Sequence, residues 1–519
     1  MSGSGSNGEI TVNNPPSRLV RLHDSDHVAV ALETLQPGDE LDQYGIAATS
    51  RVSAGHKVAL MPIAAGEGVL KYGQIIGFAK TGIEPGDHVH VHNLDMGDHR
   101  QDYAFGLDCA PLPSVPGAME FMGYHRSSGR VGTRNYLGIL TTVNCAGSVA
   151  RFIGEAVDRS GLLDGMDNID GVVPIVHGTG CGMSDRNEGY ATLFRTLSGY
   201  ARNPNFGGIL LVGLGCEVMQ IADLMGPDRQ WDDPTFGFLG IQQSGGTQRT
   251  VERGVEMLEE IATAANRIER RPAPAARLVL GLQCGGSDGY SGITANPALG
   301  AASDNLVRHG GTSILSETPE IYGAEHLLTR RAVKTEVGER LVERIRWWED
   351  YTSRNDCEMD NNPSPGNKRG GLTTILEKSL GAVAKAGTAP LSAVYKYAEP
   401  VETPGLVFMD SPGYDPCSVT GQIASGANLI AFTTGRGSVS GFMPAPCIKL
   451  ASNDGLFDRM GDDMDVNCGD IVTEGADVEE KGREIFDLFL RVASGELTRS
   501  EDLGFGGAEF VPWQIGAVM

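Results

Sequence analysis

The sequence predicts an α/β protein in which a small β-rich domain precedes larger domains built on parallel sheets. Short apolar runs separated by Pro-Gly turns fill the N-terminal part of the chain. Further along, apolar strand candidates alternate with amphipathic helix candidates, which is typical of a parallel sheet covered on both faces. We therefore expect a disordered tail 1–17, a β domain 18–93, a linker 94–120, a central βα domain 121–386 and a C-terminal α/β domain 387–519.

The β assignment of the first domain rests on short strands and repeated turns. Residues 28–32 and 57–60 are strand-like, and 35–39 and 83–87 are near-copies of one Pro-Gly turn. Residues 89–93, Val-His-Val-His-Asn, alternate, so we expect His90 and His92 on one face of a strand.

Histidine is the commonest transition-metal ligand, and this domain is rich in it. The candidate metal ligands are His23, His56, His90 and His92. The alternative is a set of solvated surface histidines.

The parallel sheets are predicted from apolar runs with helical patterns between them. The strand candidates are 137–143, 171–176, 208–213, 236–241, 278–282, 312–315, 405–410 and 428–432. The longest helix candidate among them is 251–268. Ligands bind beyond the carboxyl ends of such strands, so the loops there are the first candidates for a site.

One of these loops, residues 283–297, combines glycines with polar side chains. Glycine lets a backbone approach a ligand closely. A tight turn alone would need the glycines but not the polar residues. The candidate substrate-binding residues here are Cys284, Ser287, Asp288, Thr294 and Asn296.

Cysteine recurs after four of the predicted strands, at Cys145, Cys181, Cys216 and Cys284. If the strands share one sheet, these thiols converge at its edge and form an alternative metal site. An iron–sulfur cluster is the weaker form of this hypothesis, because the spacings match no compact cluster sequence. Buried structural cysteines are the other interpretation.

Two later loops carry cations. Lys368 lies in a Pro- and Gly-rich loop, 361–371, which is either a basic turn before a helix or a clamp for a carboxylate. Arg436 lies among small residues, in a loop typical of an anion cradle.

Composition excludes several classes of function. The net charge of −24, without a basic run, argues against nucleic-acid binding. No apolar stretch reaches the about 18 residues that a membrane helix needs. The N-terminus has no apolar signal core, and the nine cysteines are scattered, so we expect a cytoplasmic protein with free thiols.

Long stretches of the chain resemble the altronate/galactarate dehydratase family, sugar-acid hydro-lyases, in the order found in that family. The stretches are 129–135, 177–181, 213–217, 284–297, 362–371 and 433–437. Residues 55–60 and 89–93 are similar to the SAF-type β domain that precedes the catalytic part in this family. The resemblance covers nearly the whole chain from about residue 18.

The resemblance implies dehydration of a 2,3-dihydroxy sugar acid to a 2-keto-3-deoxy acid. It also implies ferrous iron, which manganese sometimes replaces. Altronate, galactarate and related acids stay open as substrates, because residues 328–351 look more like the galactarate enzymes and 89–93 more like the altronate enzymes. Oligomeric state stays open, with a homo-oligomer possible.

Removal of the proton beside a carboxylate creates an enolate, which a divalent metal and cationic donors stabilise. Arg134, Lys368 and Arg436 are the candidate donors, and Asn135 and Asn367 add to the substrate-binding set. His177 is the predicted general base, with Lys368 as the alternative.

Three rival functions stay open. The family includes a branch that cleaves sulfolactate, and the fused β domain argues mildly against it. A sugar-acid-binding protein without catalysis would keep the same loops. A nicotinamide-dependent oxidoreductase is least favoured, because no Gly-x-Gly-x-x-Gly loop follows the first strand of the βα region.

Overall fold

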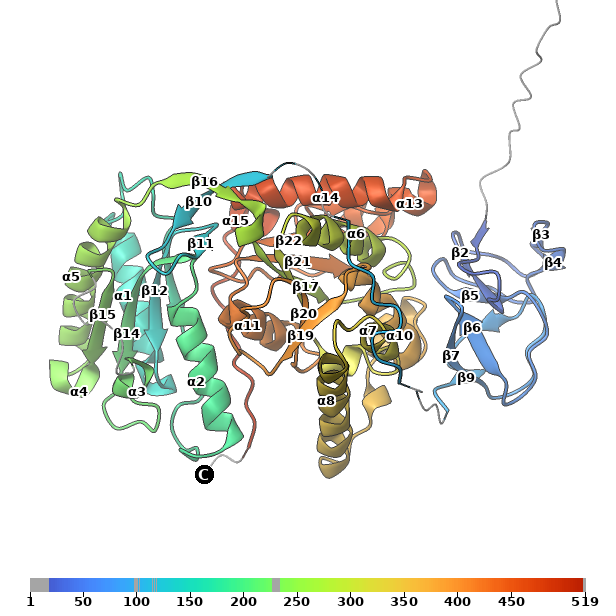
Figure 1. Cartoon of the computed structure of the whole chain (residues 1–519), viewed down its shortest axis with the longest axis horizontal. Coiled ribbons are helices and arrows are strands. Elements are labelled where there is room, and N and C mark those ends of the chain that lie inside the picture. The colour runs from blue at the N-terminus through green and yellow to red at the C-terminus, as the bar shows by residue number, and fades with distance from the viewer. Residues whose placement is uncertain are drawn as a thin grey trace, which may run out of the picture. The chain divides into compact units, whose positions relative to one another are not determined.

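The structure is a computed structural model that describes residues 18–97, 101, 103–113, 115, 117, 119–225 and 234–516 (Figure 1). The predicted disordered tail 1–17 lies outside the described residues. The chain divides into two compact units. The first comprises the described residues up to Gly97 together with Gly371–Thr373, and the second comprises the rest.

The first unit is built of short antiparallel strands, which confirms the β-rich domain. Its sheets have the orders β1-β2-β5-β8, β3-β4 and β6-β7-β9. The strands are β1 Leu19–Val20, β2 Val28–Ala31, β3 Glu40–Leu41, β4 Ile46–Ala47, β5 Lys57–Ala59, β6 Gly68–Lys71, β7 Gln74–Ala79, β8 His88–Val89 and β9 Leu94–Asp95. Leu35, Val52 and Val58 are fully buried in its core.

The two Pro-Gly repeats adopt the same turn. Gly38 and Gly86 have φ angles of 88° and 89°, a left-handed conformation that favours glycine. The carboxylate that follows each glycine accepts a hydrogen bond of 2.9 Å from a backbone N–H three residues earlier, Asp39 from Gln36 and Asp87 from Glu84. The repeated sequence therefore encodes a repeated local structure.

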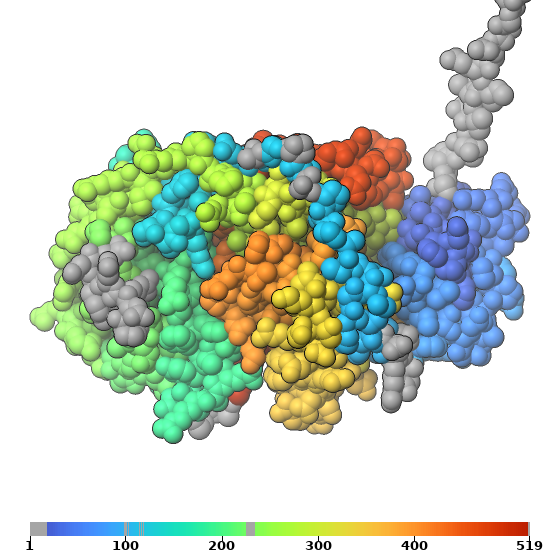
Figure 2. Space-filling model, viewed as in Figure 1, coloured from blue at the N-terminus to red at the C-terminus, as the bar shows by residue number. Residues whose placement is uncertain are grey.

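The predicted linker is shorter than expected and is held against the second unit. β9 belongs to the first unit, so the connection begins after Gly97. The Tyr103 hydroxyl donates to Glu325 Oε1 at 2.7 Å, and Arg330 forms an ion pair with Asp108 at 2.5 Å. The described part of this segment lies along the surface of the second unit (Figure 2).

The second unit contains a parallel four-stranded sheet of order β13-β12-β14-β15. Its strands confirm the first four predicted ones: β12 Tyr136–Thr141, β13 Val172–Ile175, β14 Phe206–Gly213 and β15 Phe236–Gly240. The accompanying helices are α1 Gly147–Ser160, α2 Glu188–Ala201, α3 Ile221–Met225, α4 Ile241–Ser244 and α5 Thr247–Ala265. Helices α1 and α5 cover one face (Figure 1), and α2 packs on the other.

A parallel seven-stranded sheet of order β19-β20-β18-β17-β21-β22-β23 follows. Its strands are β17 Val279–Cys284, β18 Thr312–Leu315, β19 Leu391–Tyr395, β20 Gly405–Met409, β21 Leu429–Thr434, β22 Cys447–Ala451 and β23 Val466–Asn467. Its helices are α6 Ala295–Arg308, α7 His326–Thr329, α8 Thr335–Arg354, α9 Pro365–Arg369, α10 Ile375–Val383, α11 Asp415–Ser425, α12 Asp454–Arg459, α13 Asp470–Thr473, α14 Val478–Ala493 and α15 Arg499–Asp502. Among the described residues, no helix is both long enough and apolar enough to cross a bilayer.

The two parallel sheets are separate, and this places the internal boundary elsewhere than expected. The seven-stranded sheet takes strands from both sides of residue 386, the boundary that the sequence predicted. Between the two parallel sheets lies a three-stranded antiparallel sheet of order β11-β10-β16, made of β11 Val131–Gly132, β10 Glu120–His125 and β16 Arg270–Pro274. One hydrophobic core continues from α2 to α11, so the two parallel sheets belong to one packed unit.

Candidate active-site clusters

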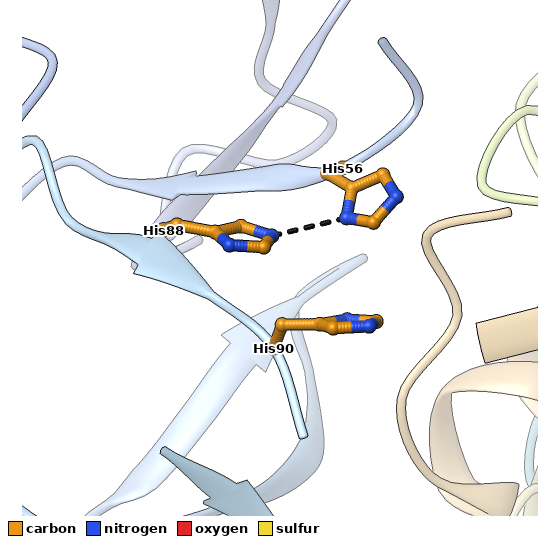
Figure 3. Close-up of side chains that lie close together, drawn as sticks. All are labelled: His56, His88 and His90. Carbon is orange, nitrogen blue, oxygen red and sulfur yellow. Dashed lines mark hydrogen bonds between the residues drawn. The ribbon is translucent and has the colours of Figure 1, made fainter. Parts of the chain in front are cut away.

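Three histidines of the first unit converge in space (Figure 3). His56 precedes β5, His88 lies in β8, and His90 follows it. His56 Nδ1 and His88 Nε2 are 3.0 Å apart, and one ligand nitrogen from each of the three rings lies within 4.8 Å of the others. The histidine cluster, His56, His88 and His90, therefore offers three nitrogens to a single metal ion.

The predicted strand 89–93 is wrong, and this is why His88 was missed. β8 ends at Val89 and the chain then turns, with the Asn93 side chain accepting a hydrogen bond from the His90 N–H at 2.9 Å. The turn brings His90 beside His88, with ring centroids 5.3 Å apart. Two other predicted ligands, His23 and His92, are exposed and lie outside this three-nitrogen group.

The donor set of the histidine cluster fits ferrous iron. Burial lowers the pKa of His88 to about 3, and the neighbouring His56 and His90 act in the same direction. The ring is therefore neutral at pH 7, which is the form that binds a metal. Imidazole nitrogen suits both iron and zinc, so donor type is compatible with the iron that the family resemblance implies.

A second cluster lies in the second unit and joins two lysines to three acidic groups. This acid–lysine cluster consists of Cys284, Glu317, Glu320, Lys378 and Lys385. Cys284 ends β17, and the two glutamates follow β18, so they lie at the carboxyl ends of central strands. That is where open α/β sheets bind ligands.

The charges of the acid–lysine cluster are in direct contact and buried. Lys378 Nζ donates to Glu320 Oε1 at 2.6 Å. Lys385 Nζ donates to Cys284 Sγ at 2.8 Å and lies 3.8 Å from Glu317 Oε2. The side chains of the two glutamates and the two lysines are between 1% and 7% exposed. Buried charges persist only when they are paired, so these residues depend on one another.

Glu317 is unusual in backbone and side chain. Its φ of 70° is left-handed, a conformation that non-glycine residues adopt mainly where surrounding structure enforces it, often at functional sites. Both carboxyl oxygens are buried without a hydrogen-bond partner among the described residues. Burial and the nearby Glu320 raise its pKa well above the usual range. Burial therefore favours the neutral form of Glu317.

The pKa values of Glu320 and Asp415 are also shifted, that of Glu320 downward and that of Asp415 upward. Burial opposes the charge of Glu320, but Lys378 and Lys385 outweigh it and lower its pKa, so Glu320 is ionised. Burial and Glu320 raise the pKa of Asp415, at the start of α11, to about 7. Neighbouring carboxyl groups whose pKa values are pushed apart are typical of an acid–base site.

The glycine-rich loop 283–297 is connected to neighbouring segments by hydrogen bonds. Asp288 is buried and accepts hydrogen bonds from Ser452 Oγ at 2.8 Å and Asn453 Nδ2 at 3.0 Å. Further bonds run from Asn296 Nδ2 to the Gly381 carbonyl, from Thr294 Oγ1 to the Ser452 carbonyl and from Asn367 Nδ2 to the Ser287 carbonyl. Of the predicted substrate-binding residues, Cys284 alone is a member of the acid–lysine cluster.

The predicted cationic donors occupy different surroundings. Arg134 is buried, and its guanidinium donates to Glu501 at 2.6 Å and to the Val492 carbonyl at 2.8 Å, which are structural contacts. Asn135 Nδ2 likewise donates to backbone carbonyls. Lys368 is partly exposed in α9, and Arg436 is exposed.

His177, the predicted base, is buried with both ring nitrogens in hydrogen bonds. Nε2 donates to the Thr141 carbonyl at 3.0 Å, and Nδ1 accepts from the Thr179 N–H at 3.3 Å. Burial lowers its pKa to about 4, although the bond to Thr141 favours the charged ring. This arrangement favours a structural role.

His177 also predicts a pH dependence of stability. The folded pKa of about 4 lies below the unfolded value of about 6.5, so its contribution is complete above pH 6.5 and is lost as the pH falls toward 4. Over this window we expect the unfolding midpoint of the wild type to fall more steeply with acidification than that of His177→Asn. Equal slopes would contradict the assignment. The kcat of His177→Asn at pH 7 tests the prediction that His177 is the general base. An unchanged kcat would show that His177 is not the base.

The four predicted edge cysteines are divided between the two parallel sheets. Cys145, Cys181 and Cys216 follow β12, β13 and β14 of the four-stranded sheet and are exposed. Cys284 ends β17 of the seven-stranded sheet and is buried. The four therefore do not share one edge.

Sequence reasoning missed Glu317, Glu320, Lys378 and Lys385. A signal was present, because Glu317 follows the predicted strand 312–315 as closely as Cys284 follows the predicted strand 278–282, and Glu320 comes three residues later. The lysines gave no comparable signal, since they lie in and after a helix whose burial depends on the tertiary fold.

Comparison with known proteins places all parts of the chain in one family. Residues 17–97 match the "Altronate/galactarate dehydratase SAF domain", residues 123–266 the "D-galactarate dehydratase/Altronate hydrolase, second domain", and residues 275–518 the "D-galactarate/Altronate dehydratase, C-terminal". The break between the last two contains β16, one strand of the antiparallel sheet.

Characterised relatives extend over almost the same length. The chain is 36% identical to the altronate dehydratase of Bacillus subtilis over 491 residues, which cover 94% of this chain and 97% of the relative. It is 38% identical to the galactarate dehydratase (L-threo-forming) of Escherichia coli over 504 residues, 94% and 95% of the two chains. It is 33% identical to the (2R)-sulfolactate sulfo-lyase subunit beta of Chromohalobacter salexigens over 391 residues, 74% and 95%. The chain belongs to the altronate/galactarate dehydratase family of hydro-lyases.

Proposed function

We propose that this protein dehydrates an altronate- or galactarate-type 2,3-dihydroxy acid to a 2-keto-3-deoxy acid, with ferrous iron as cofactor and manganese as a possible substitute. The observation that carries the proposal is the acid–lysine cluster. It sets Glu317, whose neutral form burial favours, beside Glu320, whose ionised form the two lysines favour, at the carboxyl edge of a parallel sheet. The names of the relatives supply the substrate class.

The proposed chemistry begins at C2 of the substrate. Asp415 is partly exposed and its pKa is about 7, so it can accept the C2 proton near neutral pH. Lys378 and Lys385 supply positive charge for the developing enolate. Glu317 donates its proton to the C3 hydroxyl, which leaves as water, and the enol then tautomerises to the 2-keto acid.

The histidine cluster is the proposed iron site. His56, His88 and His90 would supply the ligand nitrogens. Iron, when bound, supplies positive charge that stabilises an enolate next to a carboxylate. Sequence identity does not separate altronate from galactarate, because the values for the two kinds of relative are 36% and 38%.

A cytoplasmic location is part of the proposal. All nine cysteines are free in the structure, as expected in a reducing compartment. A homo-oligomer stays a prediction.

An anaerobic assay tests the proposed function and its rivals. In separate reactions, the full-length protein and ferrous iron are incubated with altronate, galactarate or sulfolactate. The 2-keto acid and the sulfite that form are then measured. We expect keto acid from one sugar acid, lost on chelation and restored by iron. Sulfite from sulfolactate would move the protein to the sulfo-lyase branch. Binding of a sugar acid without turnover would favour a non-catalytic role.

A further inference from the structure

Three exposed cysteines lie at the carboxyl edge of the four-stranded sheet, away from the acid–lysine cluster. Cys145, Cys181 and Cys216 follow β12, β13 and β14. β12 pairs in parallel with both β13 and β14, so the three strands end side by side. In Figure 1 this edge is the one from which β14 leads into α3 and β15 into α4. We call these residues the cysteine edge.

The three loops are held together by hydrogen bonds beside each cysteine. Asn144 donates its backbone N–H to the Thr179 carbonyl at 3.0 Å, next to Cys145. The Gly180 carbonyl, next to Cys181, accepts from the N–H groups of Val218 and Met219, both at 3.1 Å. Each cysteine is thus within two residues of a bond to a neighbouring loop, and the positions of the loops are fixed by the fold.

A further contact fixes the loop of Cys216, and a close backbone approach fixes the loop of Cys181. The Thr142 hydroxyl donates to Glu217 Oε1 at 2.6 Å. Gly215 and Gly180 have φ angles of 124° and 100°, and a Cβ at Gly180 would collide with the Thr142 carbonyl. Glycine is therefore required for the backbones to approach at this edge.

Packing does not explain these thiols. Cysteine in a fold usually serves as a small buried hydrophobe. The cysteines that belong to the seven-stranded layer follow this pattern, and Cys284, Cys417, Cys447 and Cys468 are buried. The cysteine edge is exposed instead, and it collects three thiols at one end of one sheet. Exposed thiols brought together by a rigid frame are suited to bind a soft metal centre.

The spacing of the three thiols favours a centre that is larger than a single ion. Within the described chain, the three thiols do not close to the distance at which ligand atoms share a single ion, unlike the histidine cluster. A zinc ion with bonds of about 2.3 Å to sulfur would need such closure. An iron–sulfur cluster is larger, and each thiolate binds a different iron.

We propose that Cys145, Cys181 and Cys216 bind a [4Fe–4S] cluster, with one iron left without a protein thiolate. Gln242 Nε2 donates to Cys216 Sγ at 3.5 Å, the kind of hydrogen bond to sulfur that tunes such clusters. A cavity of about 420 Å³ adjoins this loop, lined by Gly215, Glu217, Gln243 and Arg253 among others. The open iron is suited to an oxygen ligand, such as the carboxylate or hydroxyl of a small acid.

The experiment measures cofactor content and is independent of the reaction proposed above. The full-length protein is purified anaerobically and reconstituted with ferrous iron and sulfide. Iron, acid-labile sulfide, visible absorption and the electron paramagnetic resonance signal after reduction are then recorded. We expect equal iron and sulfide with a broad visible band. Cys145→Ser, Cys181→Ser and Cys216→Ser should each lose most of the sulfide and the band.

Matched variants separate this centre from other iron. Cys357→Ser removes an exposed thiol elsewhere and should keep the cluster. His56→Ala removes a ligand of the histidine cluster and should also keep the labile sulfide. Far-ultraviolet circular dichroism checks that every variant is folded. Iron without labile sulfide, zinc in place of iron, or a cluster that persists in all three cysteine variants would each overturn the proposal.

Discussion

Replacing Glu317 with Gln is expected to lower kcat by about 10²–10⁴-fold, the usual contribution of a general acid. The unfolding midpoint should change little, because burial favours the neutral carboxyl group of Glu317 in the folded protein, and the amide has the same shape and charge as that group. Steady-state formation of 2-keto acid and a thermal melt measure the two quantities. The loss should lie in kcat more than in KM, because the proton is transferred only in the reaction.

Glu325 provides a matched control for this substitution. It is another buried glutamate of the same unit, its pKa is raised by burial, and it accepts a hydrogen bond from Tyr103 outside the acid–lysine cluster. Glu325→Gln should therefore retain nearly full kcat. If Glu317→Gln is folded and keeps the activity of Glu325→Gln, Glu317 is not the acid.

Replacing His56, His88 or His90 with Ala is expected to remove most of the iron from the first unit and to lower turnover by about 100-fold or more. Loss of one imidazole leaves two nitrogens at the site, and weaker supporting contacts alone cost about 10- to 100-fold in metal affinity. Metal analysis after gel filtration and the keto-acid assay measure the effect. Excess ferrous iron should partly restore the turnover of the single variants.

His23 and His92 are the controls, because both are exposed histidines outside the three-nitrogen group. His23→Ala and His92→Ala should retain iron and activity. Loss of iron in these two variants, with iron retained in the His56, His88 and His90 variants, would place the metal site at His23 or His92. Unchanged turnover in His56→Ala, His88→Ala and His90→Ala would place the required metal elsewhere.

The strands of the second unit could be predicted because burial on both faces leaves continuous apolar runs. Residues 312–315, for example, coincide with β18. The division into two sheets was not predictable, because nothing in a run such as 278–282 states which other strand it pairs with. Antiparallel β16 intervenes just before that run and separates the layers, so Cys284 is parted from the other edge cysteines.

The residues of the histidine cluster and of the acid–lysine cluster illustrate two further limits of prediction from the sequence. Alternation in 89–93 suggested one face for His90 and His92, but an Asn93 side-chain bond turns the chain after Val89 and selects His88 instead. Lys378 and Lys385 would be solvated helix residues in most proteins. Here they are buried because Glu320 and Glu317, in the loop that follows β18, lie beside them. Such pairing depends on residues distant in sequence.

The strand order of the seven-stranded sheet has a consequence for how the protein is made. The central pair β17 and β18 is synthesised first, β19 and β20 then extend one side, and β21, β22 and β23 extend the other. Before β21 is made, one edge of the growing sheet is the six-residue β17, whereas the same side of the finished sheet ends on β23, which has two residues. Unpaired apolar edges promote association between chains. A nascent chain stopped before β21 would be aggregation-prone, so the C-terminal strands act as the closing step of biosynthesis.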